Sequence, residues 1–454
     1  MPNYLKKNKF IIILFLLAIG SGLFWNQKIF GQPIASDQLT YDGIAQDIMT
    51  KGTYTYQSEE TEIEPGYPYF LVGIYKVFGH DYNAVRVIQI LLFALIVSVT
   101  FLLAGELFGF RIAFGAGLLT SIFYGLANQA GLVQREILIT FLLVLLSYSL
   151  YKAEKSRVTW WIIAGIILGL AMLVKGIMQF FFLPVIGYMF YQYWNVIPFK
   201  KICFKAMAFL LGFLIIVGPW LARERMLGGK FGVAPKGGGL VLSMTGVAEK
   251  LSQNYFGNFV GFFLGYYFAQ KLYPNIDPVA FRDTSKMEEG IPNLKKQGKS
   301  LREIDAIFYS EAKDYIVHHP IQYAYMAGLN FISLNSPILI KGLLWQNVTA
   351  IHPMFADGRH PEASTLKKTV IALGIRLVWF ALFFFVIYGI WRSRKNLAKF
   401  SWILLLIIYL NVFNSLVWAI PRYALPMYPF YFTLASLGLV HFWDKNRDHI
   451  LRLL

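Results

Sequence analysis

The 454-residue sequence contains one cysteine, Cys203, and few charged side chains. A single cysteine excludes a disulfide within the chain and any metal site built from several cysteine ligands. Charged residues make up 15% of the chain, against about 25% in typical soluble domains. Apolar residues make up 57%, against about 45–50%. A soluble fold has too little interior to bury that much apolar surface, so the composition predicts a protein with several membrane spans.

The net charge of +17 does not indicate a nucleic-acid-binding protein. Such proteins gather lysine and arginine in a solvated stripe, whereas here the basic residues form short clusters between apolar runs. This pattern is typical of the cytoplasmic loops of membrane proteins. It predicts a multi-pass protein of the cytoplasmic (inner) membrane with both termini inside. The clusters lie near residues 6–9, 111, 152–157, 200–205, 392–399 and 445–452.

Apolar runs long enough to approach a membrane span recur along most of the chain. A span needs about 20 mostly apolar residues, and the runs predict an all-α polytopic bundle of about 10–13 transmembrane helices. Two further runs, at 258–269 and 321–344, are interrupted by polar residues or proline and predict either a pair of spans or interfacial helices. The clear runs are 10–26, 85–107, 112–129, 137–151, 158–174, 176–194, 206–221, 370–391, 402–420 and 423–443.

These runs divide the chain into three predicted regions. Residues 1–222 form an N-terminal transmembrane module, with its first outer loop at 31–84. Residues 223–367 are expected to be mostly an extracytoplasmic loop with interfacial helices, and residues 368–454 form the C-terminal transmembrane helices. No internal repeat is evident, which disfavours an inverted-repeat transporter.

The first outer loop is acidic, and its first acidic residue has a distinctive position. Asp37 opens a helix-like run that ends at Gly52. A helix macrodipole favours an ionised carboxylate at the N-terminus, so Asp37 is expected to accept a proton at neutral pH. The alternative is a simple helix cap on a solvated acidic face. After this run, Glu64-Pro65-Gly66-Tyr67-Pro68 breaks the chain and begins a second helix that extends to Phe78.

Several short motifs, in order along almost the whole chain, resemble the polyprenyl-phosphate-sugar-dependent glycosyltransferases of the GT-C fold. The similarity is greatest to the protein O-mannosyltransferase and lipid A aminoarabinose transferase group. The motifs are Asp37-x-x-x-Tyr41-x-x-x-Ala45, Pro65-Gly66-Tyr67-Pro68, Val85-Arg86-x-x-Gln89, Glu136, Pro219-Trp220-x-x-Arg223, Glu311-Ala312 with Tyr315-Ile316 and His319-Pro320, and Pro421-Arg422-Tyr423-x-x-Pro426-x-x-Pro429-Phe430.

The resemblance implies an enzyme that moves a hexose or pentose from a lipid phosphate to an acceptor on the outer face of the membrane, with inversion at the anomeric carbon. Asp37 would be the general base that takes the acceptor proton. Glu136 would orient the acceptor or pair with a phosphate-binding arginine. Arg223 and Arg422 would bind the departing phosphate. Lys175 either reaches the phosphate or anchors its turn, and the anchor is favoured.

Three further residues, Tyr41, Tyr67 and Glu64, are expected to line the substrate cavity. The phosphate is already a competent leaving group, so a protonating acid is not obligatory. A cofactor is not expected to be required, and neither is a divalent metal. If a metal is bound, Asp37 and Glu136 are its expected ligands. The expected partners are membrane lipid, the polyprenyl-phosphate sugar and an acceptor protein, lipid or glycan.

Two other classes of function stay open at this point. A flippase or transporter of lipid-linked glycans needs ionisable residues within its spans, and Arg376 is the main one here. A non-catalytic membrane scaffold would have no use for the gathered acids and arginines.

Overall fold

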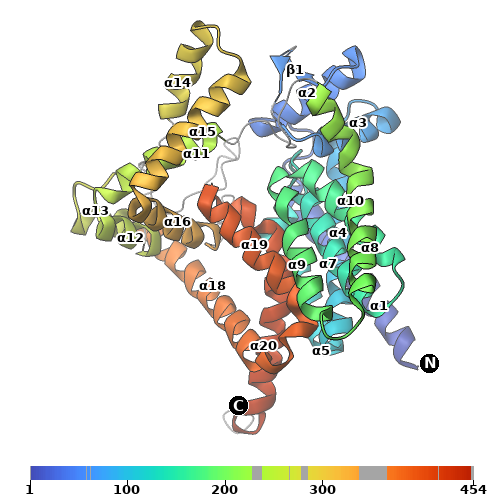
Figure 1. Ribbon diagram of the computed structural model, residues 1–454. Coiled ribbons are helices and arrows are strands. Elements are labelled where there is room, and N and C mark those ends of the chain that lie inside the picture. Colours follow the sequence, from blue (N-terminus) through green and yellow to red (C-terminus); the bar gives the residue numbers. More distant parts are fainter. Residues whose placement is uncertain are drawn as a thin grey trace. The chain divides into compact units, whose positions relative to one another are not determined.

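A computed structural model describes residues 2–57, 59–61, 63–226, 238–264, 266–277, 285–336, 366–417 and 419–450, which are mostly helical (Figure 1). The chain forms two compact units. Unit 1 comprises Met1–Val233, Leu382–Ile408 and Leu425–Leu454, and unit 2 comprises Ala234–Ala381 and Tyr409–Ala424. The boundaries near 222 and 368 predicted from the sequence stay a prediction.

Unit 1 contains a helical bundle and a small folded loop. The bundle begins with α1 (Pro2–Asn26), and the loop consists of α2 (Asp37–Lys51), the hairpin of β1 (Thr55–Tyr56) and β2 (Glu59–Glu60), and α3 (Gly66–Phe78). The hairpin is antiparallel, with Thr55 opposite Glu60. The chain then continues through α4 (Tyr82–Phe108), α5 (Phe110–Ile122), α6 (Tyr124–Gln129), α7 (Glu136–Lys155), α8 (Thr159–Val174), the 3₁₀ helix η1 (Gly176–Phe180), α9 (Phe182–Tyr193) and α10 (Phe199–Met226).

The C-terminal part of the chain begins with α18 (Leu366–Arg392), which runs from unit 2 into unit 1. It continues through η4 (Arg394–Phe400), α19 (Ser401–Val417), η5 (Pro421–Met427) and α20 (Tyr428–Ile450).

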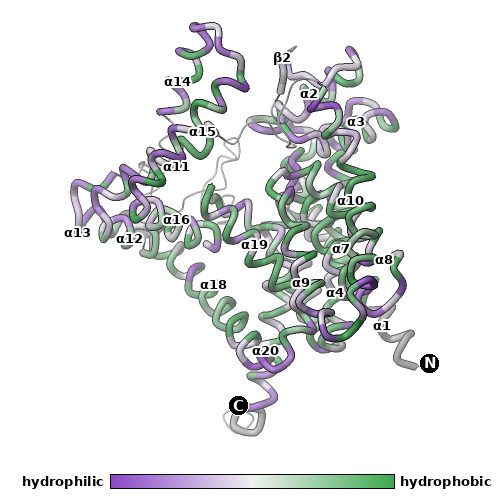
Figure 2. The backbone as a smooth tube through the Cα atoms, viewed as in Figure 1, coloured by the Kyte–Doolittle hydropathy of each residue, from purple (hydrophilic) through white to green (hydrophobic). Residues whose placement is uncertain are grey.

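The residues that the structure describes include six helical segments long and apolar enough to cross a membrane, and two shorter apolar helices, α5 and α8. Figure 2 shows these helices as predominantly hydrophobic and α14 as largely hydrophilic. The all-α polytopic membrane fold predicted from the sequence is thereby confirmed. The six segments are Lys9–Asn26, Tyr82–Phe108, Glu136–Lys155, Phe199–Met226, Leu373–Arg392 and Arg394–Val417.

Two predicted spans differ from continuous helices. The run at 112–129 is divided into α5 and α6 because Phe123 has an extended backbone (φ −68°, ψ 111°). The run at 176–194 begins as the 3₁₀ helix η1 and continues as the 12-residue α9. Apolar composition therefore located both segments but did not reveal their breaks.

The helices α8 and α10 pack with their backbones in contact. A Cβ added at Gly165 would lie 2.0 Å from the carbonyl oxygen of Phe209, and one at Gly212 would lie 2.1 Å from that of Ile162. Only glycine allows so close an approach, which is a common way for membrane helices to associate. The relative register of α8 and α10 is therefore fixed by main-chain contact.

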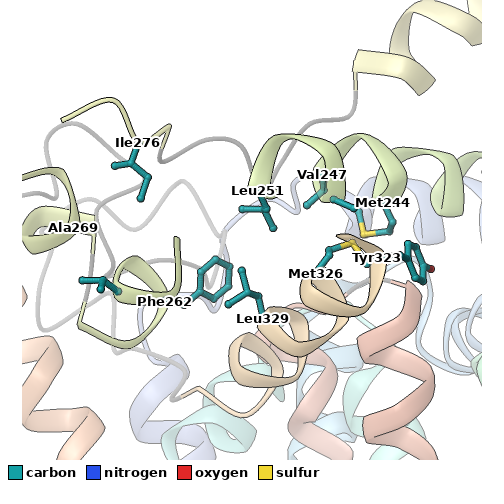
Figure 3. Packing of buried hydrophobic residues seen from close by; sticks show 11 residues of the cluster. Met244, Val247, Leu251, Phe262, Ala269, Ile276, Tyr323, Met326 and Leu329 are labelled. Atoms are coloured by element: carbon teal, nitrogen blue, oxygen red, sulfur yellow. The ribbon is translucent and has the colours of Figure 1, made fainter. Parts of the chain in front are cut away.

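Unit 2 has its own apolar core, drawn in Figure 3. Met244, Val247 and Leu251 of α11 pack with Met326 and Leu329 of α16 in this cluster. A second, smaller cluster joins α11 to α15. The helices are α11 (Gly238–Ser252), α12 (Tyr255–Leu264), α13 (Tyr266–Leu272), α14 (Ser285–Lys296), α15 (Leu301–His318) and α16 (Pro320–Leu334).

The structure bears on the two interrupted runs of the sequence. Residues 258–269 fall in α12 and α13, which have 10 and 7 residues, and α16 has 15 residues. None is as long as the about 20 residues that a span needs. Residue 265, between α12 and α13, and residues 337–344 of the second run lie outside the described part of the chain. The choice between a pair of spans and interfacial helices therefore stays a prediction.

Candidate active site

Helix α2 begins at Asp37, as the sequence predicts, and ends at Gly52. Ser36 directly before it has a positive φ of 56°, and Gly52 closes the helix in the left-handed conformation (φ 69°, ψ 13°). The Asp37 side chain is exposed, and the Ser36 hydroxyl lies 3.5 Å from its carboxylate. The carboxylate thus stands in the first turn of α2, where the macrodipole favours its ionised form.

The start of α2 is held against the segment that leads into α7. The Gln38 side-chain oxygen accepts a hydrogen bond from the backbone N–H of Val133 at 2.9 Å. Its amide group donates to the carbonyl of Ala35 at 3.1 Å. Gln38 is 4% exposed, so this link is a buried one. It fixes the residue next to Asp37 relative to the N-terminus of α7.

The motif residues Arg86 and Gln89 in α4 hold the chain on both sides of this contact. Arg86 is 1% exposed and donates to the carbonyls of Gln32 at 2.7 Å and Gly131 at 3.2 Å. Gln89 donates to the carbonyls of Ala130 and Leu132. Both side chains therefore satisfy buried main-chain groups. They position the segments before α2 and before α7.

Asp42, which the sequence did not distinguish among the loop acids, lies at the centre of a buried network. It accepts hydrogen bonds from Tyr75 at 2.7 Å, Tyr82 at 3.1 Å and Gln46 at 2.6 Å, and lies 2.8 Å from a ring nitrogen of His80. Burial and the bond to Asp42 raise the pKa of Tyr75 well above its ordinary value. Asp42 therefore joins α2 to α3 and α4, and its lone pairs are committed to the fold.

Glu64 links the loop to two ends of the bundle. Its carboxylate forms an ion pair with Arg135 and accepts the backbone N–H of Gly176 at 2.8 Å. The Arg135 guanidinium also lies 5.9 Å from the ring centroid of Tyr41. The pairing of Arg135 with Glu64 was not predicted from the sequence. A partner 71 positions away, and not on the same helix, leaves no pattern in the sequence.

Tyr41 and Tyr67 lie edge to face, with ring centroids 5.0 Å apart. They are 6% and 0% exposed, and the Tyr67 hydroxyl donates to Gln89 at 2.9 Å. Burial raises the pKa of Tyr67. Tyr41 is four residues after Asp37, so the two side chains lie on the same face of α2. The substrate-cavity role expected for both tyrosines stays a prediction.

Glu136 begins α7 and is 2% exposed. Its carboxylate lies 3.5 Å from the side-chain nitrogen of Gln129, which also donates to Gln134 at 2.6 Å. An acid at this position is stabilised by the helix N-terminus. Val133, three residues before Glu136, is hydrogen-bonded to Gln38, which directly follows Asp37. The segment before α7 therefore connects the helix start that carries Glu136 with the helix start that carries Asp37.

The predicted cations Arg223 and Lys175 also lie in unit 1. Arg223, near the end of α10, stacks on Trp220 at 4.7 Å and Tyr54 at 5.6 Å, and pairs with Glu224 at 2.6 Å. Its side chain is 37% exposed. Lys175 caps α8 and is 7% exposed. Arg223 thus lies in the last turn of α10, and Lys175 directly follows the last residue of α8.

Arg422 lies in η5, within unit 2, with its guanidinium 5.8 Å from the ring centroid of Tyr423. Its predicted role at the donor phosphate stays a prediction. Within the described residues, no group of three or more His, Cys, Asp or Glu side chains is placed to hold a metal ion.

Residues 63–222 match the family model described as dolichyl-phosphate-mannose-protein mannosyltransferase. The chain is also 26% identical over 216 residues to an undecaprenyl phosphate-alpha-4-amino-4-deoxy-L-arabinose arabinosyl transferase of Pseudomonas aeruginosa, and 24% identical over 193 residues to one of Pseudomonas savastanoi. The resemblance predicted from the motifs is confirmed. The two alignments cover 45% and 40% of this chain, and only 39% and 36% of those relatives.

The fold is similar to that of the archaeal oligosaccharyltransferase of Archaeoglobus fulgidus, solved with an inhibitory peptide and a dolichol-phosphate. The TM-score is 0.56 at 14% identity, and the match covers 98% of this chain and 51% of that one. At this identity the likeness shows the fold alone. It supports the GT-C fold. The family match includes Glu64, Arg86, Arg135 and Glu136, and it ends one residue before Arg223.

Proposed function

We propose that this chain is an integral membrane glycosyltransferase. It moves a monosaccharide from a polyprenyl-phosphate donor to an acceptor hydroxyl or phosphate on a protein, lipid A or an envelope glycan. The reaction takes place at the outer face of the cytoplasmic membrane. The arabinosyl transferase relatives, whose names include undecaprenyl phosphate, support this donor class.

The observation that carries the proposal is the placement of Asp37. It is an exposed carboxylate on a rigid frame, because Gln38, Arg86 and Gln89 fix the segments around it through buried hydrogen bonds. A fixed, solvent-accessible base is what proton abstraction from an incoming acceptor needs.

In the proposed reaction the acceptor oxygen attacks the anomeric carbon of the sugar. Its proton passes to the Asp37 carboxylate as the new carbon–oxygen bond forms. At the same time the bond between the anomeric carbon and the phosphate oxygen breaks, and polyprenyl phosphate leaves with that electron pair. Attack opposite the leaving group inverts the anomeric configuration. No redox partner or bound metal enters this balance.

Negative charge grows on the departing phosphate, so cations near it lower the barrier. Arg223 suits this role because its stacking on Trp220 and Tyr54 leaves the planar group partly exposed and fixed. Burial raises the pKa of Tyr54, so its ring stays neutral beside the guanidinium. Arg422 and Lys175 are the further candidates, and Glu136 would orient the acceptor.

The test compares cell-envelope lipids, glycans and proteins by mass spectrometry in a strain lacking the chain and in strains carrying wild type, Asp37→Asn or Asp81→Asn. Asp81 is the matched control. It is exposed, lies in the same loop and caps α4 by accepting from the Asn83 N–H at 2.8 Å, and asparagine caps helices as well as aspartate.

One sugar missing from one acceptor in the null and Asp37→Asn strains, and present with Asp81→Asn, is the expected result. General-base catalysis contributes about 10²–10⁴-fold, so normal decoration by Asp37→Asn would refute the assignment of the base. An unmodified but mislocalised lipid-linked glycan, rescued by Asp37→Asn, would instead indicate a flippase.

A further inference from the structure

Unit 2 contains a pocket that the proposed chemistry does not use. It has a volume of about 540 Å³, within the range of small-molecule sites, and lies where α11, α14 and α15 meet (Figure 1). Its lining residues are mostly polar and come from all three helices. They are Leu242, Thr245, Lys286, Glu311, Asp314, Tyr315, His318 and His319.

Helix α15 separates its structural residues from those that line the pocket. Ile304, Phe308 and Ala312 recur every four residues and are buried in the smaller core cluster. Glu311 and Asp314, on the adjoining face, are exposed side chains that line the pocket. The N-terminus of α15 is closed separately by a capping box at Ser300 and Glu303. The helix therefore does not need the two carboxylates in order to form.

Contacts to neighbouring groups hold several of the lining residues in place. Thr245 is fully buried, and its hydroxyl donates to the carbonyl of Leu242 at 2.7 Å. Lys286 pairs with Glu249 at 3.2 Å and lies 5.5 Å from the ring centroid of Tyr315. Tyr315 in turn packs on His319 with centroids 4.6 Å apart. An aromatic face thus lies beside carboxylates and a cation.

The lining also contains a paired acid and imidazole on α15. A ring nitrogen of His318 lies 3.4 Å from the Asp314 carboxylate and 2.9 Å from the Asp314 carbonyl oxygen. Carboxylates accept only, an ammonium group donates only, and an imidazole can do both. The lining residues therefore offer both hydrogen-bond donors and hydrogen-bond acceptors.

This combination matches one class of ligand best. Sugar hydroxyls both donate and accept, and the apolar C–H face of a sugar ring packs on an aromatic ring. A phosphate is disfavoured because Glu311 and Asp314 both bear negative charge in the lining. A metal ion is disfavoured because, within the described residues, no group of three or more His, Cys, Asp or Glu side chains is placed to hold one.

We propose that this pocket binds the carbohydrate portion of the acceptor. That the bound carbohydrate belongs to an acceptor rests on the proposed function, whereas carbohydrate binding to the pocket does not depend on catalysis. It assigns unit 2 the recognition of the molecule that is glycosylated, and leaves proton transfer to Asp37 of unit 1.

Saturation-transfer difference NMR on the full chain in nanodiscs tests this directly. The probes are methyl glycosides of mannose, galactose and N-acetylglucosamine, with a lysine-rich peptide as the competing ligand class. The test variant is Glu311→Gln with Asp314→Asn. The matched control is Glu288→Gln with Glu289→Gln, which removes two exposed acids of α14 outside the lining.

At least one glycoside should receive saturation from the wild type. The test variant should bind it about tenfold more weakly, as expected for the loss of about 1.4 kcal/mol, while the control variant and Asp37→Asn bind normally. The proposal would be overturned if no glycoside received saturation, or if the test variant gave the same saturation transfer as the wild type. It would also be overturned if only the peptide bound, in a way that required Glu311 and Asp314. Binding that depends on the pocket in a chain with no transferase activity would refute the proposed function and retain the pocket.

Discussion

Asp42→Asn should destabilise the outer loop of unit 1, although Asp42 is not the proposed base. Each Asp42 oxygen has two close partners: Tyr75 and His80 approach one, and Gln46 and Tyr82 approach the other. In asparagine one of these oxygens becomes an NH₂ group, so two of the four contacts lose their acceptor.

The expected magnitude follows from those two contacts. Hydrogen bonds to a charged group are worth about 1.5–3 kcal/mol each, so losing two lowers the local opening free energy by at least about 3 kcal/mol. At about 1.4 kcal/mol per factor of ten, amides of α2 and α3 should exchange with solvent on the order of 10² times faster. Hydrogen exchange followed by mass spectrometry measures this for the two helices separately from the rest of the chain.

Asp37→Asn is the control for this measurement because Asp37 is exposed. It should leave exchange in α2 nearly unchanged and remove transfer, while Asp42→Asn should accelerate exchange and reduce transfer only through loss of the folded loop. Wild-type exchange in Asp42→Asn would refute the account of the network. Accelerated exchange in Asp37→Asn would show that its carboxylate is structural.

Three further variants test other contacts. Glu64→Gln removes the charge that pairs with Arg135, so it should lower sugar transfer by loosening the loop. Reversing the charges of both partners together should restore part of the transfer activity, and no recovery would contradict the pairing. Arg223→Lys keeps the charge but loses the planar stack, so it should raise the KM for the donor more than Arg225→Lys does. Donor titration in vesicles measures this, and equal effects of the two variants would contradict the role of Arg223 at the phosphate. Hydrogen bonds from Ser300 lower the pKa of Glu303, so its cap stabilises α15 above the ordinary pKa of 4.5 and is lost as the pH falls through the lowered pKa. Glu303→Gln should therefore increase hydrogen exchange at the start of α15 at pH 7 and differ little from wild type in strong acid. A difference in exchange that does not change with pH would contradict the cap.

The sequence predicted the spans and the position of α2 because both depend on local patterns. Apolar runs are long, and Asp37 and Gly52 mark the two ends of one short helix. The break at Phe123 was not predicted, since phenylalanine has no backbone restriction that distinguishes it from its neighbours. Its extended conformation is a result of tertiary packing.

The contacts that position the site could not be predicted in the same way. The acceptors of Arg86 are backbone carbonyls 45 and 54 residues away, and any residue supplies such a group. The motif drew attention to Arg86 and Gln89 without giving their function. Asp42 and Asp37 belong to the same acidic loop, and only burial distinguishes a structural carboxylate from a candidate base.

The close packing of α8 and α10 also limits how this protein can change. Arg223 lies eleven positions beyond Gly212, on a helix whose depth and rotation are set where Gly165 and Gly212 let the two main chains touch. Each residue inserted into a helix advances everything after it by about 1.5 Å and turns it by about 100°. One extra residue between Gly212 and Trp220 would therefore turn both Trp220 and the Arg223 guanidinium away from Tyr54, although no side chain had been altered. The contact between the two helices therefore sets the position of Arg223 along α10. Substitutions along the lipid-facing side of α10 should be tolerated far better than any change in its length.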